Sequence, residues 1–224
     1  MAGAFAASGQ QEMWKAQRVG ARVVAIGYTR ERGTMDAAVW LLTDDEWTRV
    51  PATEFDESGT QIMLEVAGGR QGVPLVAVGC HDDGFARCDT ASSSTADAAV
   101  WSSSDGGRSW ERLTPDGGRL EGPGVQVMRA VITFQGSLVA VGTRLGPGSG
   151  DDLDGAVWTS LDGLEWRSPG PLDPTISALG GPGDQSLRAL VAYGRQRIGL
   201  LGLGVTNEGE VEDAQVWTAI VLSR

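Results

Sequence analysis

The sequence predicts an all-β fold, a four-bladed β-propeller built from four-stranded antiparallel blades. Its 224 residues include 33 glycines and 9 prolines, too many turn-forming residues for a helical protein. One pattern of short apolar runs recurs four times, with a period of about 60 residues. Repeats of this kind each form one small sheet, and neighbouring sheets stack to bury a common core that no single repeat could form.

Each repeat contains β runs in a fixed order. The innermost run opens on a glutamine, the second contains a glycine, and the third has the form Asp-x-x-Val-Trp. In the first three repeats a tight turn and a second tryptophan follow, which predicts an outer strand. The third runs are "DAAVW" at 36–40, "DAAVW" at 97–101, "DGAVW" at 154–158 and "DAQVW" at 213–217.

We expect a single domain over residues 1–224. The fourth repeat stops at "VWTAIVLSR" and has no outer strand, which would leave an unpaired edge. We expect residues 3–8 to form that strand, with Phe5 in place of the missing tryptophan, so that the N-terminal strand completes the last blade and closes the ring. A fragment of a larger ring and a dimer that shares blades are the alternatives. The predicted blades span about residues 11–50, 61–114, 126–168, and 185–224 with 3–8.

The turn between third and outer strands carries a motif. The second repeat has the run Ser-x-Asp-x-Gly-x-Ser-Trp, and the third has a shorter form, "SLDGLEW". This run resembles the Asp-box, or BNR repeat, of sialidases and related propellers. The resemblance implies a turn at the edge of a blade, away from any active site, so we interpret its residues as structural. They are Ser103, Asp105, Gly107 and Trp110 in the second repeat, and Ser160, Asp162 and Trp166 in the third.

Sialidase activity would need more than this motif. The resemblance implies six blades, an arginine triad, a Tyr/Glu nucleophile pair and an aspartic acid that donates a proton. Here only Arg129 and Arg188 share a repeat position, and Tyr28 and Tyr193 end different strands without a glutamate partner in view. The sequence therefore assigns no catalytic residues. It leaves enzymatic activity open and favours a protein without it.

The predicted site lies on the face that carries the long loops, around the mouth of the central channel. Four repeat glutamines begin the innermost strands there, and two arginines follow three residues later. They could bind a sugar, an ion or ordered water, or they could instead bond neighbouring blades. The candidate ligand-binding residues are Gln11, Gln61, Gln126, Gln185, Arg129 and Arg188.

The leading functional hypothesis is a non-catalytic recognition module that binds a glycan or a protein through this face. One alternative is an enzyme that acts on a carbohydrate or small metabolite at the channel mouth. The other is a structural subunit of a larger assembly. The net charge of −11 would repel phosphate backbones and anionic lipids, so we expect no nucleic-acid partner, no membrane insertion, and a monomer.

Cys80 and Cys88 lie in one loop, "CHDDGFARC", and a disulfide between them is expected. A metal loop with His81 as a further ligand is the alternative, but zinc sites use four ligands. We predict no metal and no cofactor. Binding of Ca²⁺ by the carboxylates of the long loops is the alternative. The disulfide favours an extracellular or cell-surface protein over a cytoplasmic one, with a leader absent from this chain.

Overall fold

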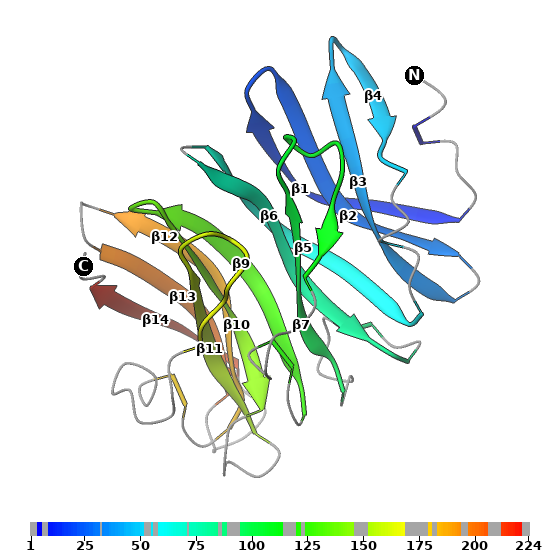
Figure 1. Cartoon of the computed structure of the whole chain (residues 1–224). Coiled ribbons are helices and arrows are strands. Elements are labelled where there is room, and N and C mark those ends of the chain that lie inside the picture. The colour runs from blue at the N-terminus through cyan, green and yellow to red at the C-terminus, as the bar shows by residue number, and fades with distance from the viewer. Residues whose placement is uncertain are drawn as a thin grey trace.

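The chain folds into four antiparallel β-sheets that follow one another across the molecule in a row (Figure 1). The computed structural model describes residues 4–5, 9–31, 33–51, 55, 58–70, 72–84, 87–88, 95–113, 120–121, 124–145, 152–168, 179–180, 183–193, 197–205 and 212–220. No helix that could cross a membrane occurs in these ranges.

Each repeat forms one sheet, with its strands in sequence order. Sheet one contains β1 (Gln10–Val19), β2 (Arg22–Glu31), β3 (Thr34–Thr43) and β4 (Glu46–Arg49). Sheet two contains β5 (Thr60–Arg70), β6 (Val73–Asp82), β7 (Asp97–Ser103) and β8 (Glu111–Arg112). Sheet three contains β9 (Gln126–Phe134), β10 (Ser137–Leu145) and β11 (Leu153–Ser160). Sheet four contains β12 (Gln185–Tyr193), β13 (Arg197–Val205) and β14 (Glu212–Ile220).

The outer strand shrinks from one sheet to the next. Sheets one and two have it as β4 and β8, whereas in sheet three a single bridge between Thr159 and Arg167 takes its place. In the described part of sheet four, β14 is the last strand. The prediction of all-β antiparallel sheets is therefore confirmed.

A β-bulge interrupts every innermost strand at the same repeat position, where the pairing register shifts. The bulged residues are Trp14, Leu64, Arg129 and Arg188. The repeat glycine of the second strand lies beside this bulge. A Cβ at Gly27, Gly79 or Gly142 would overlap the backbone carbonyl oxygen of the residue two before the bulge. The bulge therefore explains why the second strands of sheets one, two and three need a glycine.

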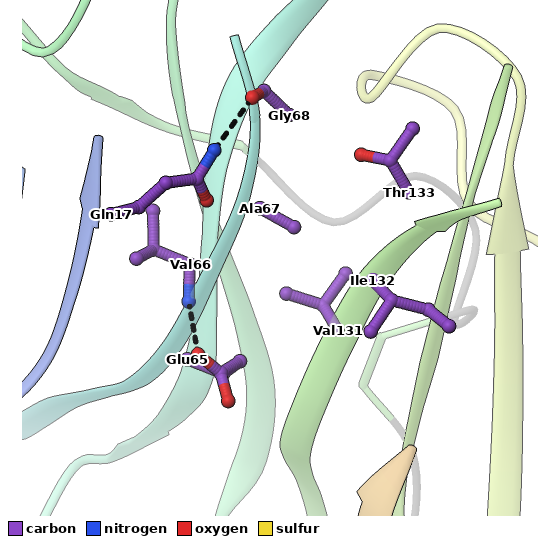
Figure 2. A pocket seen from close by; sticks show the side chains of 8 residues that line it. All are labelled: Gln17, Glu65, Val66, Ala67, Gly68, Val131, Ile132 and Thr133. Carbon is purple, nitrogen blue, oxygen red and sulfur yellow. Dashed lines mark hydrogen bonds between the residues drawn. The ribbon is translucent and has the colours of Figure 1, made fainter. Parts of the chain in front are cut away.

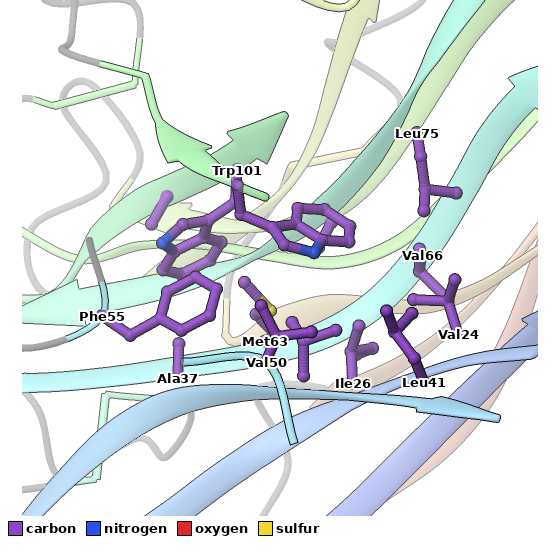
Figure 3. Close-up of a cluster of buried hydrophobic side chains, with 14 residues drawn as sticks. Val24, Ile26, Ala37, Leu41, Val50, Phe55, Met63, Val66, Leu75 and Trp101 are labelled. Atoms are coloured by element: carbon purple, nitrogen blue, oxygen red, sulfur yellow. The ribbon is translucent and has the colours of Figure 1, made fainter. Parts of the chain in front are cut away.

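Neighbouring sheets bury the third-strand residues between them. Trp101 of sheet two shares a cluster with Val39 and Ile26 of sheet one, joined by Phe55 from the connecting segment (Figure 3). Trp158 packs in the same way with Val100 of sheet two. The third-strand tryptophan of one sheet thus packs against the third-strand valine of the preceding sheet at both interfaces, as expected for stacked repeats.

The N-terminal segment lies elsewhere than predicted. The carbonyl oxygen of Ala4 accepts a hydrogen bond from Trp40 Nε1 at 3.3 Å, and the ring centroids of Phe5 and Trp47 are 6.2 Å apart. Both contacts are with sheet one, so the prediction that these residues continue the edge of sheet four is wrong. The other residues of 3–8 lie outside the described ranges.

The spacing of the repeats explains this placement. Phe5 precedes Gln11 by the same number of residues as Phe55 precedes Gln61, so the N-terminal segment corresponds to the connection between two sheets. Among the described residues, no hydrophobic cluster joins sheet one to sheet four, and the predicted closure of the ring is not seen there.

Candidate functional site

Four side chains form a cluster where the innermost strand of sheet one begins. Glu12 of β1 pairs with Tyr28 of β2 in the antiparallel register, so the two side chains share one face of the sheet. The bulge at Trp14 turns the indole toward the same place, and Trp14 Nε1 donates to Glu12 Oε2 at 2.8 Å. Arg87, from the loop after β6, completes what we call the Trp14 cluster: Glu12, Trp14, Tyr28 and Arg87.

Arg87 covers the aromatic part of this cluster. Its guanidinium carbon lies 5.3 Å from the Trp14 ring centroid and 5.5 Å from that of Tyr28, within the range of cation–π attraction. The two rings meet edge to face with their centroids 6.0 Å apart. An Arg87 Nη1–H also donates to the Tyr28 hydroxyl at 3.3 Å. The guanidinium is therefore held by both rings and by a hydroxyl.

The predicted disulfide is present and fixes the chain next to Arg87. Cys80 and Cys88 are bonded, with their Cα atoms 5.8 Å apart, and both are fully buried. This bond rules out the alternative of a metal loop with these two cysteines as ligands. Since Arg87 immediately precedes Cys88, the disulfide attaches it to the end of β6. Arg87, from the loop that follows β6 of sheet two, thus contacts residues of sheet one.

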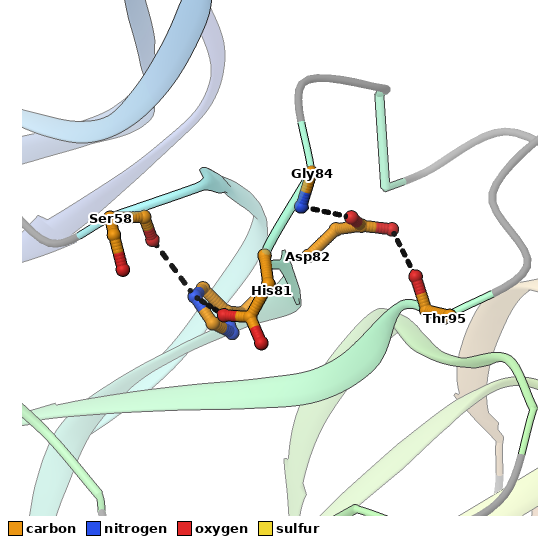
Figure 4. Close-up of polar contacts among 6 residues, drawn as sticks. Ser58, His81, Asp82, Gly84 and Thr95 are labelled. Atoms are coloured by element: carbon orange, nitrogen blue, oxygen red, sulfur yellow. Dashed lines mark hydrogen bonds and ion pairs between the residues drawn. The ribbon is translucent and has the colours of Figure 1, made fainter.

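Asp82 connects the two ends of the same loop by hydrogen bonds, as Figure 4 shows. One oxygen of its carboxylate accepts the amide of Gly84 at 2.7 Å, and the other accepts the Thr95 hydroxyl at 3.3 Å. His81 contacts the carbonyl oxygen of Ser58 through Nε2 at 3.2 Å. These contacts give Asp82 and His81 structural roles.

The charges of the Trp14 cluster are set by its internal contacts. The hydrogen bond from Trp14 lowers the pKa of Glu12 below its usual value, and bonds from Tyr28 and Gln10 and the charge of Arg87 add to this. Burial raises the pKa of Tyr28, and its hydrogen bond with Glu12 acts in the same direction. At neutral pH the cluster therefore holds a carboxylate, a neutral phenol and a guanidinium.

Sequence reasoning missed this cluster. Tyr28 does have a glutamate partner, because Glu12 lies directly opposite it in the β1–β2 ladder. The expectation that no glutamate was in view is wrong. Aligning the first two strands of the repeat so that residues 12 and 28 pair would have revealed the Glu12–Tyr28 contact. Nothing in the sequence indicated Arg87, because it comes from the loop of another sheet.

The predicted glutamines lie in successive interfaces between sheets. Gln126 and Gln185 begin β9 and β12, and Gln61 is the second residue of β5. Each shares a face with the residue two positions on. Those residues pack against the preceding sheet, each in the hydrophobic cluster between the two sheets: Met63, Met128 and Leu187. The role of these amides in ligand binding stays a prediction.

The other predicted residues differ in their surroundings. Gln11 shares its face with Met13, which is exposed, and both lie on the side of sheet one that faces away from sheet two. Arg129 is partly buried at its bulge, whereas Arg188 is exposed. Neither arginine belongs to the Trp14 cluster.

A cavity of about 480 Å³ opens at the other end of the innermost strands. It is lined by Gln17 of β1, residues 65–68 of β5 and residues 131–133 of β9 (Figure 2). Its polar groups are largely engaged. Gln17 Nε2 donates to the Gly68 carbonyl oxygen at 2.8 Å, and Glu65 pairs with Lys15 at 3.2 Å. The cavity therefore offers few free groups for recognition.

The two predicted turn motifs have matching hydrogen bonds. Asp105 Oδ1 accepts the amides of Arg108 and Ser109 at 2.9 and 3.0 Å, and the Ser103 hydroxyl at 2.9 Å. Trp110 Nε1 donates to the Gly107 carbonyl oxygen at 3.0 Å. These contacts organise a turn, as their sequence pattern predicts.

The second motif repeats the arrangement. Asp162 Oδ1 accepts the amides of Leu164 and Glu165 at 2.9 and 2.8 Å, and Trp166 Nε1 donates to the Gly163 carbonyl oxygen at 3.3 Å. Ser160 Oγ accepts the Gly163 amide at 2.8 Å. Both turns lie at the end of the sheets opposite the Trp14 cluster, because they follow the third strands.

Comparison with known proteins gives a structural likeness only. No protein-family model matches the sequence, and no curated protein sequence matches it. The chain superposes on a protein solved in complex with RGII (TM-score 0.54, 12% identity, 92% of this chain and 69% of that protein). The fold is propeller-like.

Two carbohydrate-active propellers show the same likeness. One is the Penicillium chrysogenum α-L-arabinanase complexed with arabinobiose (TM-score 0.52, 12% identity). The other is the Fusarium graminearum α-L-arabinofuranosidase complexed with an iminosugar inhibitor (TM-score 0.53, 9% identity). Each match covers 92% of this chain, which spans 61% of the length of either enzyme.

Proposed function

We propose that this protein is a non-catalytic recognition module that binds a glycan through the Trp14 cluster. The observation that carries the proposal is the joint presence of an ionised carboxylate, a guanidinium and an aromatic ring at one partly buried place. Sugar ligands present hydroxyl groups and apolar ring faces, so a few placed polar groups beside aromatic surface suit them. The propeller-like fold, shared with proteins solved in complex with arabinobiose and RGII, supports the choice of a glycan over a protein ligand.

One feature favours binding over catalysis. Tyr28 is buried beneath Arg87, and burial raises its pKa, whereas a nucleophile must be accessible to its substrate.

The test is retention on immobilised arabinan and on an array of other polysaccharides, with arabinobiose as the soluble competitor. We expect the purified protein to be retained by at least one glycan. Trp14→Ala and Arg87→Ala should weaken retention about tenfold or more, as hot-spot truncations do. Met13→Ala is the matched control, since this neighbour is exposed on the other face of β1 and should bind normally. Failure of the wild-type protein to bind any glycan would contradict the proposal.

A second candidate function is an enzyme that cleaves a glycosidic bond, and the Glu12–Tyr28 pair is the observation that favours it. Release of reducing sugar from the same polysaccharides distinguishes the two functions. Turnover that is lost in Glu12→Gln would establish the enzyme, whereas retention without turnover supports the recognition module. The disulfide is consistent with an extracellular protein, where glycans of this kind are met.

A further inference from the structure

The cavity of about 480 Å³ lies at the inner edge of the interface between sheets two and three. Ala67 of β5 and Val131 of β9 line it, and both belong to the hydrophobic cluster between these two sheets. Gln17 of β1 borders it from the side of sheet one. Its volume falls within the range of about 300 to 1,000 Å³ that pockets for small molecules have. The cavity is therefore large enough for a small ligand.

In the interface between sheets one and two, a glutamine side chain crosses the equivalent place. Gln17 extends from β1, and its Nε2 donates to the main-chain carbonyl oxygen of Gly68 in β5 at 2.8 Å (Figure 2). The group that makes this contact is a primary amide on a short alkyl stem. It joins the innermost strands of two successive sheets.

The repeat has a much shorter side chain at this point in the next interface. Gln17 pairs with the residue three before the repeat glycine of its second strand, and Ala67 does the same in sheet two. Gly68 and Thr133 each pair with the residue four before that glycine. Ala67 and Thr133 are therefore the counterparts of Gln17 and Gly68. Because a methyl group cannot reach as far as a glutamine side chain, a cavity remains between sheets two and three.

The walls of the cavity combine apolar side chains with few polar groups. The oxygen of the Gln17 amide is an acceptor, because the nitrogen of the same amide is already engaged as a donor. Thr133 is exposed and lies across the cavity from Gln17 (Figure 2). The charges of Glu65 and Lys15 compensate each other at 3.2 Å. These surroundings suit a neutral ligand that has an apolar body and a hydrogen-bond donor. The apolar side chains of the wall are Val66, Ala67, Val131 and Ile132.

We propose that this cavity is a second binding site, for a small neutral ligand that carries a primary amide on an apolar stem. The amide takes the place of the glutamine side chain that this interface lacks. Its N–H groups donate to the main-chain carbonyl oxygen of Thr133 and to Gln17 Oε1, and its stem packs against Ala67 and Val131. A carboxylate is disfavoured, because it has no donor and would meet Glu65 in a protein of net charge −11.

Binding of hexanamide, followed by ligand-observed NMR, tests the proposal, with hexanoate as the control ligand of the same length. We expect hexanamide to bind and hexanoate not to bind at the same concentration. Ala67→Gln should weaken hexanamide binding about tenfold or more, because the new side chain occupies the cavity. Ala16→Gln is the matched control, because Ala16 is exposed on β1 and does not line the cavity. A wild-type protein that does not bind hexanamide, or binds hexanoate equally well, would overturn the proposal.

A second variant and a titration of the wild-type protein decide the question even if Ala67→Gln does not fold. Gln17→Met keeps the size of the side chain but removes the acceptor, so the affinity for hexanamide should fall about tenfold. During the titration, the backbone amide signals of Ala67 and Val131 should shift. Unchanged affinity of Gln17→Met, or shifts confined to other parts of the chain, would contradict the proposal.

The cavity and the Trp14 cluster are tested independently of each other. They lie at opposite ends of the innermost strands, so Trp14→Ala should bind hexanamide normally, and hexanamide should not compete with glycan retention. Loss of hexanamide binding in Trp14→Ala would show that the ligand binds at the Trp14 cluster and not in the cavity. Failure of the wild-type protein to bind a glycan would leave the proposal for the cavity intact.

Discussion

At the scale of single residues, the aspartates of the turn motifs act as hydrogen-bond centres. Burial works to raise the pKa of Asp105, but the amide and hydroxyl of Ser109 and the hydroxyl of Ser103 outweigh it, and the pKa is lowered. Asp162 has a lowered pKa chiefly through the amides of Glu165 and Leu164. An ionised carboxylate at each turn therefore stabilises the connection to the outer strand.

We predict that Asp105→Ala lowers the free energy of unfolding by about 2 kcal/mol, the usual scale for hydrogen bonds to a charged group. The loss arises because the amides of Arg108 and Ser109 and the hydroxyl of Ser103 lose their acceptor. Urea unfolding followed by tryptophan fluorescence measures it. Asp83→Ala is a suitable control, since Asp83 is exposed. Equal stability of the two variants would contradict the prediction.

The same aspartates predict an acid dependence of stability. Because their folded-state pKa values lie below the unfolded value of about 3.9, their contribution is complete above that pH. It is lost as the pH falls from about 4 through the folded-state pKa, when the carboxylates become protonated. Melting temperatures from pH 7 to pH 2.5 test this. Asp105→Asn should melt with a shallower acid slope, and an unchanged slope would count against the assignment.

At the scale of elements, the bulge and its glycine form one unit. A Cβ at Gly79 would overlap the carbonyl oxygen of Ile62, which is held by the bulge of β5. We predict that Gly79→Ala costs about 3 kcal/mol, because backbone and not a flexible side chain must move. The control is Gly20→Ala, in a turn with φ 62° and open space around it, which should cost about 1 kcal/mol. Chemical denaturation compares them, and equal losses would contradict this explanation.

The loop between β6 and β7 links the disulfide to the proposed site. Replacing both cysteines, Cys80→Ala with Cys88→Ala, should lower stability by about 2 to 3 kcal/mol on the chain-entropy model. It should also weaken glycan retention, because Arg87 is attached through Cys88 to the end of β6. Glycan titrations of the oxidised and reduced wild-type protein give an independent comparison. Retention that is insensitive to both treatments would show that Arg87 is held by its aromatic contacts alone.

At the scale of the whole molecule, each sheet depends on its neighbours for a buried core. The three clusters that contain Trp101, Trp158 and Trp217 each combine residues of two successive sheets. No single repeat could bury these side chains alone.

Much of the architecture could be predicted from the repeat alone. The Asp-x-x-Val-Trp runs, the glycine of each second strand and the turn motifs depend on neighbours in sequence or on the adjacent strand. Their spacing therefore carries the information. The disulfide was predictable for the same reason, since Cys80 and Cys88 lie in one loop. Arg129 and Arg188 were correctly recognised as sharing a repeat position, but the repeat glycine alone did not indicate the bulge that makes this position distinct.

The sequence by itself determined the four repeats, the antiparallel strands and the disulfide, because these follow from local periodicity and short-range spacing. Only the tertiary structure decided which faces meet. It placed Ala4 and Phe5 on sheet one, put Glu12 beside Tyr28, and brought Arg87 across from sheet two. Packing between sheets depends on the angle and register of whole elements, which no short stretch of sequence specifies, and the proposed site arises at this level.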